Sequence, residues 1–374
     1  MHRTWLWIFL LGLLSMLTAG CGSAGSASPI PTPTPVAKGV AEFLYAGNEV
    51  SANISGYSVN PSSGALTPLS GFPIAVGSEV DYLTHDALNK FMVSVDTSAN
   101  LIHVFGINSS TGALTEIAPS PYTVGKEPRA AAFDPGGKFV YVASMSLNSV
   151  DAFSISSSGV LTAVPGSPFP TGGTSTTGSF GCCVVVDPTG KFLYVQDHLN
   201  VYSFLINATT GALTLVTTTA GPGFGNGLAV DPAGAFLYAV GSGNNSILTY
   251  AINSSSGALT FAFGSPMALQ TGSFAIVLDP MGAFAYTVEN AQSVVVYRLQ
   301  NGRFTSLGAS FSGALGTQQL AIDPTGSFLY APQTGNLDNI SGFQISQSGS
   351  LTAITGSPFP SGSQPFSVAI IPKQ

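Results

Sequence analysis

A hydrophobic-aromatic step recurs seven times along this chain of 374 residues, and the repetition constrains the fold more than any other feature. The steps begin at Phe43, Phe91, Phe139, Phe192, Phe236, Phe284 and Phe328. By subtraction, successive repeats are 44 to 53 residues apart. Periods of this length are typical of propellers and solenoids, in which one repeat is a single supersecondary unit that cannot bury its apolar faces alone. We therefore expect one large repeat domain.

A full repeat contains four strand-like segments joined by short turns, at residues 130–133, 139–143, 150–155 and 160–164. Four strands in a meander are typical of a propeller blade. The repeats begin with a second strand at residues 42–46, and the chain ends with a first-strand sequence at residues 366–371. Pairing these two segments would remove both sheet edges. The sequence predicts an all-β, seven-bladed propeller over residues 40–374, closed by its C-terminal strand.

The repeated Asp-Pro pairs are interpreted as turn formers. Asp accepts hydrogen bonds from the backbone that follows, and Pro pre-sets a turn dihedral. These pairs begin at Asp134, Asp187, Asp231, Asp279 and Asp323, and their regular spacing argues against metal ligands. The aromatic residues of the second and third strands recur with equal regularity, so we interpret them as core.

The N-terminus is predicted to be a targeting segment. Arg3 precedes an apolar stretch, residues 5–17, which is too short to span a membrane. The segment ends in Leu-Thr-Ala-Gly-Cys, which resembles a bacterial lipobox with Cys21 as the lipid attachment site. The alternative is ordinary secretory cleavage nearby. We expect a signal peptide over residues 1–20, a Ser/Pro-rich tether over 21–39, and an extracytoplasmic protein anchored to a membrane.

Composition excludes some classes of partner and site. The net charge of -7 provides no basic stripe for nucleic acid. No His/Cys cluster has zinc spacing, and we predict neither a metal nor a cofactor; calcium at rim carboxylates stays open. Cys182 and Cys183 are interpreted as buried thiols, with a redox pair as the alternative. We expect a monomer.

Charges divide between the two rims of the predicted propeller. The turn rim carries the Asp-Pro turns and the turns between third and fourth strands. The loop rim carries the loops before the first strand and after the second strand of each repeat. No repeat rule demands the loop-rim charges, which makes them candidates for a site; the alternative is a solvated rim. They are Glu49, Glu79, Asp81, Asp96, Lys126, Glu127, Arg129, Asp197, Glu289 and Asp338, with His198 beside Asp197.

Repeats such as residues 129–143, RAAAFDPGGKFVYVA, resemble the lactonase-type seven-bladed propellers. That family includes bacterial 6-phosphogluconolactonase-like enzymes and relatives of the YVTN-repeat surface proteins. The resemblance covers about residues 40–374 and implies an Arg-His pair before a first strand and a Glu after a second strand. Arg129 matches the Arg and Glu289 matches the Glu, in different repeats, but Ala130 stands where His is expected.

These departures favour a binding function over catalysis. A phosphorylated lactone needs a basic pocket, whereas this rim is acidic. Our first hypothesis is therefore a propeller of the cell envelope that binds a protein, a glycan or a small lactone through an incomplete lactonase site. The alternative is hydrolysis of an uncharged lactone, with Glu289 as general base and Arg129 stabilising the oxyanion. That alternative requires the two side chains to converge on one pocket.

Overall fold

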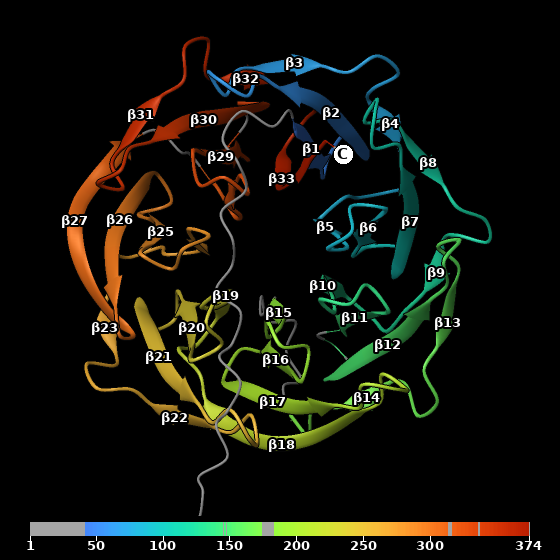
Figure 1. Ribbon diagram of the computed structural model, residues 1–374, viewed down its shortest axis with the longest axis vertical. Coiled ribbons are helices and arrows are strands. Elements are labelled where there is room, and N and C mark those ends of the chain that lie inside the picture. The colour runs from blue at the N-terminus through green and yellow to red at the C-terminus, as the bar shows by residue number, and fades with distance from the viewer. Residues whose placement is uncertain are drawn as a thin grey trace, which may run out of the picture. The chain divides into compact units, whose positions relative to one another are not determined.

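The computed structural model describes residues 42–373 except 145, 147, 174–182, 313–315 and 336. These residues form seven antiparallel sheets around a common axis, as Figure 1 shows. The predicted seven-bladed propeller is therefore confirmed. The described part of the chain contains no helix that is long and apolar enough to cross a membrane.

Seven short strands form the innermost layer and surround the axis. In blade order they are β33 (Pro365–Pro372), β5 (Tyr82–His85), β10 (Pro128–Phe133), β15 (Cys183–Val186), β19 (Gly225–Val230), β24 (Ile276–Leu278) and β28 (Ala321–Ile322). Neighbouring innermost strands contact one another around the whole ring. Side chains that point inward from this layer therefore meet on the axis.

The second strands carry the repeated aromatic step. They are β1 (Glu42–Asn48), β6 (Phe91–Asp96), β11 (Phe139–Ser144), β16 (Phe192–Gln196), β20 (Phe236–Gly241), β25 (Phe284–Glu289) and β29 (Phe328–Gln333). The third strands are β2 (Asn53–Val59), β7 (Leu101–Ile107), β12 (Ser149–Ile155), β17 (Asn200–Ile206), β21 (Ser246–Ile252), β26 (Ser293–Gln300) and β30 (Asn339–Ile345). Their aromatic side chains are buried, as predicted, except for Phe236 and Phe284, which are partly buried.

The outermost strand departs from the expected single segment. It is continuous only in the fourth and sixth blades, as β18 (Leu213–Ala220) and β27 (Arg303–Ser312). Elsewhere it has two pieces, namely β3 (Leu66–Pro68) and β4 (Ile74–Ala75), β8 (Leu114–Glu116) and β9 (Tyr122–Thr123), β13 (Leu161–Ala163) and β14 (Phe169–Pro170), β22 (Leu259–Phe261) and β23 (Met267–Ala268), and β31 (Leu351–Ala353) and β32 (Phe359–Pro360). In four of these five breaks, a Ser-Pro serine accepts a third-strand backbone N–H at 2.9–3.0 Å, which replaces a lost ladder bond: Ser120, Ser167, Ser265 and Ser357.

The ring closes between β1 and β33, as predicted. The two strands pair antiparallel from Glu42↔Pro372 to Asn48↔Pro365, and Figure 1 shows them side by side. The junction of blades seven and one repeats the contacts of the other junctions. The Tyr330 hydroxyl donates to the Gly64 carbonyl at 2.6 Å, and a Cβ at Gly64 would lie 2.5 Å from the Phe328 ring. The same Phe-glycine contact recurs at every junction.

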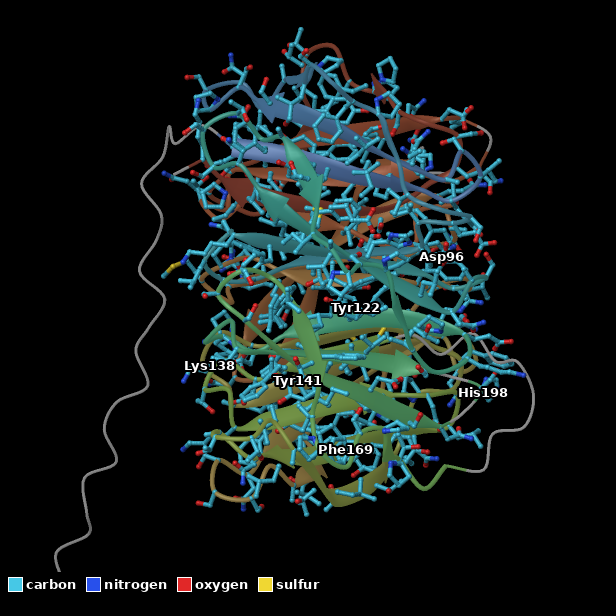
Figure 2. All side chains as sticks on the ribbon, turned by 90° about the vertical axis from the view of Figure 1, so that its right-hand side faces the viewer. Asp96, Tyr122, Lys138, Tyr141, Phe169 and His198 are labelled. Atoms are coloured by element: carbon cyan, nitrogen blue, oxygen red, sulfur yellow. The ribbon has the colours of Figure 1, made fainter. Side chains whose placement is uncertain are left out.

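The Asp-Pro turns are confirmed as structural. In the Asp187 turn, the carboxylate accepts the backbone N–H groups of Lys191 at 2.8 Å and Phe192 at 2.7 Å. The glycine with positive φ in these turns comes three residues after the Asp, as at Gly190. Figure 2 shows Lys138 of one such turn at one rim, and Asp96 and His198 at the opposite rim.

Candidate functional site

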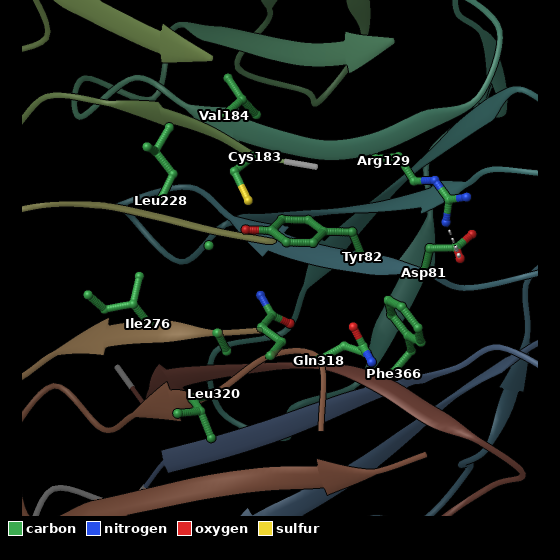
Figure 3. Close-up of a pocket in the computed structure, with 13 residues that line it drawn as sticks. Asp81, Tyr82, Arg129, Cys183, Val184, Leu228, Ile276, Gln318, Leu320 and Phe366 are labelled. Carbon is green, nitrogen blue, oxygen red and sulfur yellow. Dashed lines mark ion pairs between the residues drawn. The ribbon is translucent and has the colours of Figure 1, made fainter. Parts of the chain in front are cut away.

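A cavity of about 220 Å³ lies where the innermost strands begin, at the loop rim. All seven blades contribute to its wall, as Figure 3 shows in close-up. Its lining residues are Asp81, Tyr82, Arg129, Cys183, Val184, Gly227, Leu228, Ala275, Ile276, Gln318, Gln319, Leu320 and Phe366. Because the innermost strands converge on the axis, residues far apart in the sequence share this one space.

An ion pair forms one side of the cavity. Arg129 Nη1 lies 3.9 Å from Asp81 Oδ1, a contact drawn as a dashed line in Figure 3. Asp81 is buried, and its other oxygen accepts the backbone N–H of Thr97 at 3.0 Å. The Thr97 hydroxyl donates at 2.6 Å to the carbonyl of Pro128, the residue before Arg129. Thr97 therefore connects both partners of the ion pair to the end of β6 and positions them.

Tyr82 and the two glutamines add polar groups to the wall. The Tyr82 ring extends into the cavity from β5, as Figure 3 shows. Gln319 Oε1 accepts the backbone N–H of Val368 in β33 at 3.0 Å, and this bond ties the loop before β28 to the closing strand. Gln318 Nε2 donates to the Gly316 carbonyl at 3.3 Å. These groups leave a polar sector that contains one guanidinium and one carboxylate among the described residues.

The remaining wall is apolar. Val184, Leu228, Ile276 and Leu320 come from blades four to seven and lie together on the side of the cavity away from Arg129 (Figure 3). Val184 and Leu320 are buried, whereas Leu228 and Ile276 are partly exposed. The cavity is therefore amphipathic, with its charged groups on blades two and three.

Acidic side chains make the surroundings of Arg129 electronegative. Burial raises the pKa of Glu49, and the charges of Asp81 and Glu79 raise it further, while Arg129 lowers it. Burial also raises the pKa of Glu79, with Asp81 adding to the shift. These effects place Glu49, Glu79 and Asp81 within electrostatic reach of one another. The predicted loop-rim acids therefore gather here in part.

Glu289 does not line this cavity. Its carboxylate accepts hydrogen bonds from two hydroxyls of its own blade, Tyr297 at 2.5 Å and Thr287 at 3.0 Å, and from the Gln270 backbone at 3.0 Å, in the connection from the fifth blade. Glu289 is also buried. The hydrolase hypothesis drawn from the sequence required Glu289 and Arg129 to converge on one pocket. The structure does not bring them together at the cavity.

The position of Glu289 follows a repeat rule that the sequence analysis did not detect. The fifth residue after the repeat Phe is polar in every blade but the fifth, where it is Gly241, and each of these polar side chains forms hydrogen bonds at the loop rim: Asn48, Asp96, Ser144, Asp197, Glu289 and Gln333. Asp197, for example, accepts the Tyr202 hydroxyl at 2.6 Å. The interpretation that no repeat rule demands these charges is therefore wrong for Asp96, Asp197 and Glu289.

Asp96 shows how strongly such a carboxylate is held. Burial by itself would raise its pKa, but the hydrogen bonds from Ala99, Ser78 and Glu79 together outweigh that effect, so the pKa is lowered. The Ala99 bond is 2.9 Å long. The ionised form of Asp96 thus stabilises its loop.

The other predicted rim residues lie outside the cavity wall. Lys126 is exposed, and Glu127 donates its backbone N–H to Asn100 at 2.8 Å. Asp338 is exposed and accepts the Gln364 backbone N–H at 3.0 Å. His198 packs edge-on against Phe224. None of these four residues lines the cavity wall among the described residues.

The remaining histidines and cysteines were also interpreted from the sequence. His85 is partly buried with Nδ1 3.0 Å from the Asp86 carbonyl, and His103 is buried beside Glu116, in keeping with a place in the packed interior. Cys183 lies in the cavity wall. Cys21 and Cys182 lie outside the described residues, so lipid attachment and the redox alternative stay predictions. The described part of the chain contains no group of His, Cys, Asp and Glu suited to a metal.

From the sequence we did not predict Tyr82, Gln318, Phe366 or the apolar wall. A signal for them exists in the repeat. Asp81, Arg129 and Gln318 each lie ten residues before a repeat Phe, by subtraction from Phe91, Phe139 and Phe328. The residues at this repeat position and at the two that follow it differ between repeats. These are the positions from which residues line the axial cavity.

Comparison with known proteins agrees with the fold. A family model described as "Lactonase, 7-bladed beta-propeller" matches residues 75–273 and 228–370, together well over half of the chain. No match was found among curated proteins.

Three solved structures are similar over nearly the whole chain. A candidate 6-phosphogluconolactonase from Bacteroides fragilis is 22% identical, with a TM-score of 0.75, covering 90% of this chain and 100% of the other. A second such candidate, from Bacteroides uniformis, is 19% identical, with a TM-score of 0.76 and coverage of 89% and 100%. A periplasmic gluconolactonase from Pseudomonas aeruginosa is 18% identical, with a TM-score of 0.74 and coverage of 89% and 100%. At these identities the structures support the shared fold, and the family match completes the assignment: the chain belongs to the lactonase family of seven-bladed β-propellers.

Proposed function

We propose that this propeller is a binding protein of the cell envelope that takes a small molecule into its axial cavity without hydrolysing it. The proposal rests on the contacts that already occupy the two candidate carboxylates, Glu289 and Asp81. Glu289 accepts three hydrogen bonds, two of them inside its own blade, and Asp81 is held by Thr97 and lies beside Arg129. A general base must reach the water that it activates. Glu289 does not line the cavity, and the two oxygens of Asp81 face Arg129 and the Thr97 N–H.

The cavity itself supports binding. It combines a guanidinium, which donates up to five hydrogen bonds, with an apolar wall that gains from desolvation. Concave sites of this mixed character are usual for small-molecule ligands. Arg129 would hold an oxygen of the ligand, and Asp81 and Thr97 would keep Arg129 in place.

The experiment compares binding with turnover. The full-length protein is titrated calorimetrically with a panel of neutral and phosphorylated lactones, and hydrolysis is followed by acid release. We expect saturable binding of at least one neutral lactone and no hydrolysis above the uncatalysed rate. Turnover that is lost in Asp81→Asn would instead favour hydrolysis.

Hydrolysis of a lactone is the second candidate, and the proximity of Asp81 to Arg129 favours it. In that case Asp81 would accept a proton from water and Arg129 would stabilise the oxyanion. The names of the similar Bacteroides and Pseudomonas proteins point in the same direction.

We also propose that the protein is held at a membrane, outside the cytoplasm, by a lipid on Cys21. The Leu-Thr-Ala-Gly-Cys sequence supports this proposal. Metabolic labelling with a radioactive fatty acid should label the wild-type protein and not Cys21→Ala. Equal labelling of both would contradict the anchor.

A further inference from the structure

The two walls of the axial cavity differ in what they can recognise, and this difference restricts the ligand. The inference rests on the proposed binding function. The wall from blades four to seven presents Val184, Leu228, Ile276 and Leu320. These side chains cannot donate or accept a hydrogen bond. A ligand hydroxyl against them would lose its water without compensation, which costs free energy.

A polyhydroxylated sugar ring therefore fits this wall poorly. An aliphatic or aromatic body fits it well, because burial of apolar surface on both partners is favourable. The cavity volume of about 220 Å³ lies below the roughly 300–1,000 Å³ usual for pockets that hold drug-sized ligands, so the body is small.

The charges on the opposite wall restrict the polar end of the ligand. Arg129 is the one cationic side chain of the described wall, and Asp81 lies 3.9 Å from it. Glu49 and Glu79 lie within electrostatic reach of Asp81. A carboxylate or phosphate brought to Arg129 would meet these acids, and like charges at short range repel. A neutral oxygen acceptor avoids that repulsion and still receives hydrogen bonds from the guanidinium.

We propose that the cavity binds an uncharged small molecule with an aliphatic or aromatic body and a single ester- or ketone-type carbonyl. The carbonyl oxygen points toward Arg129 and Tyr82. The body packs against Leu228, Ile276 and Leu320. Sugar lactones and phosphorylated lactones are disfavoured, the former by the apolar wall and the latter by the acids.

Three probes of similar size separate these features in titrations of the full-length protein. γ-Octalactone has the neutral carbonyl and the apolar body, octanoate has the body with a charge, and δ-gluconolactone has the carbonyl with a polyhydroxylated body. We expect γ-octalactone to bind at least tenfold more tightly than either of the others. Leu228→Asn should weaken γ-octalactone binding about tenfold, and Ile276→Asn provides a second test if that variant folds poorly. Leu215→Asn, at an exposed leucine of β18, is the matched control and should bind normally.

The outcomes separate the ligand class from the proposed function. If δ-gluconolactone or octanoate binds as tightly as γ-octalactone, and Arg129→Gln abolishes that binding, the ligand class is overturned while the binding function stands. If Leu228→Asn and Leu215→Asn have equal effects, the apolar wall plays no part and the inference is again overturned. If no probe binds at about millimolar concentration, the proposed function fails together with the inference.

Discussion

The turn rim and the loop rim both carry carboxylates, but those of the loop rim include Asp81, which lines an open cavity. On the turn rim, each Asp of an Asp-Pro turn accepts backbone N–H groups from its own turn, in the same geometry from blade to blade. On the loop rim, the residues that end the second strands vary in type among the blades. Some loop-rim side chains form hydrogen bonds that hold loops in place, and others line the cavity. In a repeat protein, the regular rim builds the fold, and the irregular rim provides a site.

The largest effect on the free energy of unfolding is expected when a turn on the regular rim is broken. Asp187→Ala removes a buried carboxylate that accepts the N–H groups of Lys191 and Phe192. Hydrogen bonds to charged groups contribute about 1.5–3 kcal/mol each, so we expect a loss of roughly 3–6 kcal/mol in the free energy of unfolding. Urea denaturation measures it. Asp338→Ala, at an exposed loop-rim carboxylate, should cost less than about 1 kcal/mol. Equal losses would remove the distinction between the rims.

The second effect depends on pH and concerns Glu42, where β1 begins at the turn rim. Burial, and then the charge of Asp323, raise the pKa of Glu42 from 4.5 to about 8. Between these values the folded state holds a proton that the unfolded state has lost, so the free energy of unfolding falls as pH rises from 4.5 to about 8. Glu42→Gln removes this loss and should stabilise the protein by roughly 1–3 kcal/mol near pH 8.

Thermal melts at about pH 5, 7 and 9 compare the wild type, Glu42→Gln and the control Glu127→Gln. The melting temperature of the wild type should decline relative to that of Glu42→Gln across this range. The control should follow the wild type. Parallel curves for all three proteins would contradict the assignment.

A third effect separates the two kinds of loop-rim residue. Glu289→Gln keeps the shape of the side chain but weakens its bonds to Tyr297 and Gln270, so stability should fall by about 1–2 kcal/mol. The affinity for a bound lactone should not change, because Glu289 does not line the cavity. Arg129→Gln should do the reverse and weaken binding at least tenfold, about 1.4 kcal/mol. Loss of affinity in Glu289→Gln would place that carboxylate in the site after all.

The smallest effects are expected at exposed lysines on the two rims. Lys126→Ala on the loop rim and Lys138→Ala on the turn rim should each change the free energy of unfolding by no more than about 0.5 kcal/mol. Neither should alter ligand affinity in titration. If only Lys126→Ala weakens binding, the ligand extends beyond the cavity onto the loop rim.

Much of the fold could be predicted because its signals are local and repeated. The Asp-Pro turns, the aromatic step and the first-strand sequence at the C-terminus can each be seen in a short segment. The interruption of the outer strands was missed, although the Ser-Pro pairs mark it at Ser120, Ser167, Ser265 and Ser357. At these breaks a serine hydroxyl accepts the hydrogen bond in place of a backbone carbonyl. The pattern of four strands per repeat does not reveal this substitution.

The candidate site was less predictable because its contacts cross blades. Arg129 was identified by its match to a family motif, and Asp81 by its charge on the rim. Their pairing depends on Thr97, which bonds to Asp81 and to Pro128 from a neighbouring blade. Glu289 matched the motif equally well, but Tyr297 and Gln270 hold it away from the axis.

The sequence by itself determined the number of blades, the closing strand and the structural role of the turn carboxylates, because each can be recognised in short segments that repeat along the chain. Only the tertiary structure decided which loop-rim side chains reach the axis. That outcome depends on seven innermost strands converging on one space, where Asp81 from the second blade and Phe366 from the closing strand line the same cavity. It also depends on cross-strand hydrogen bonds, which hold Glu289 in its own blade while Arg129 lines the cavity.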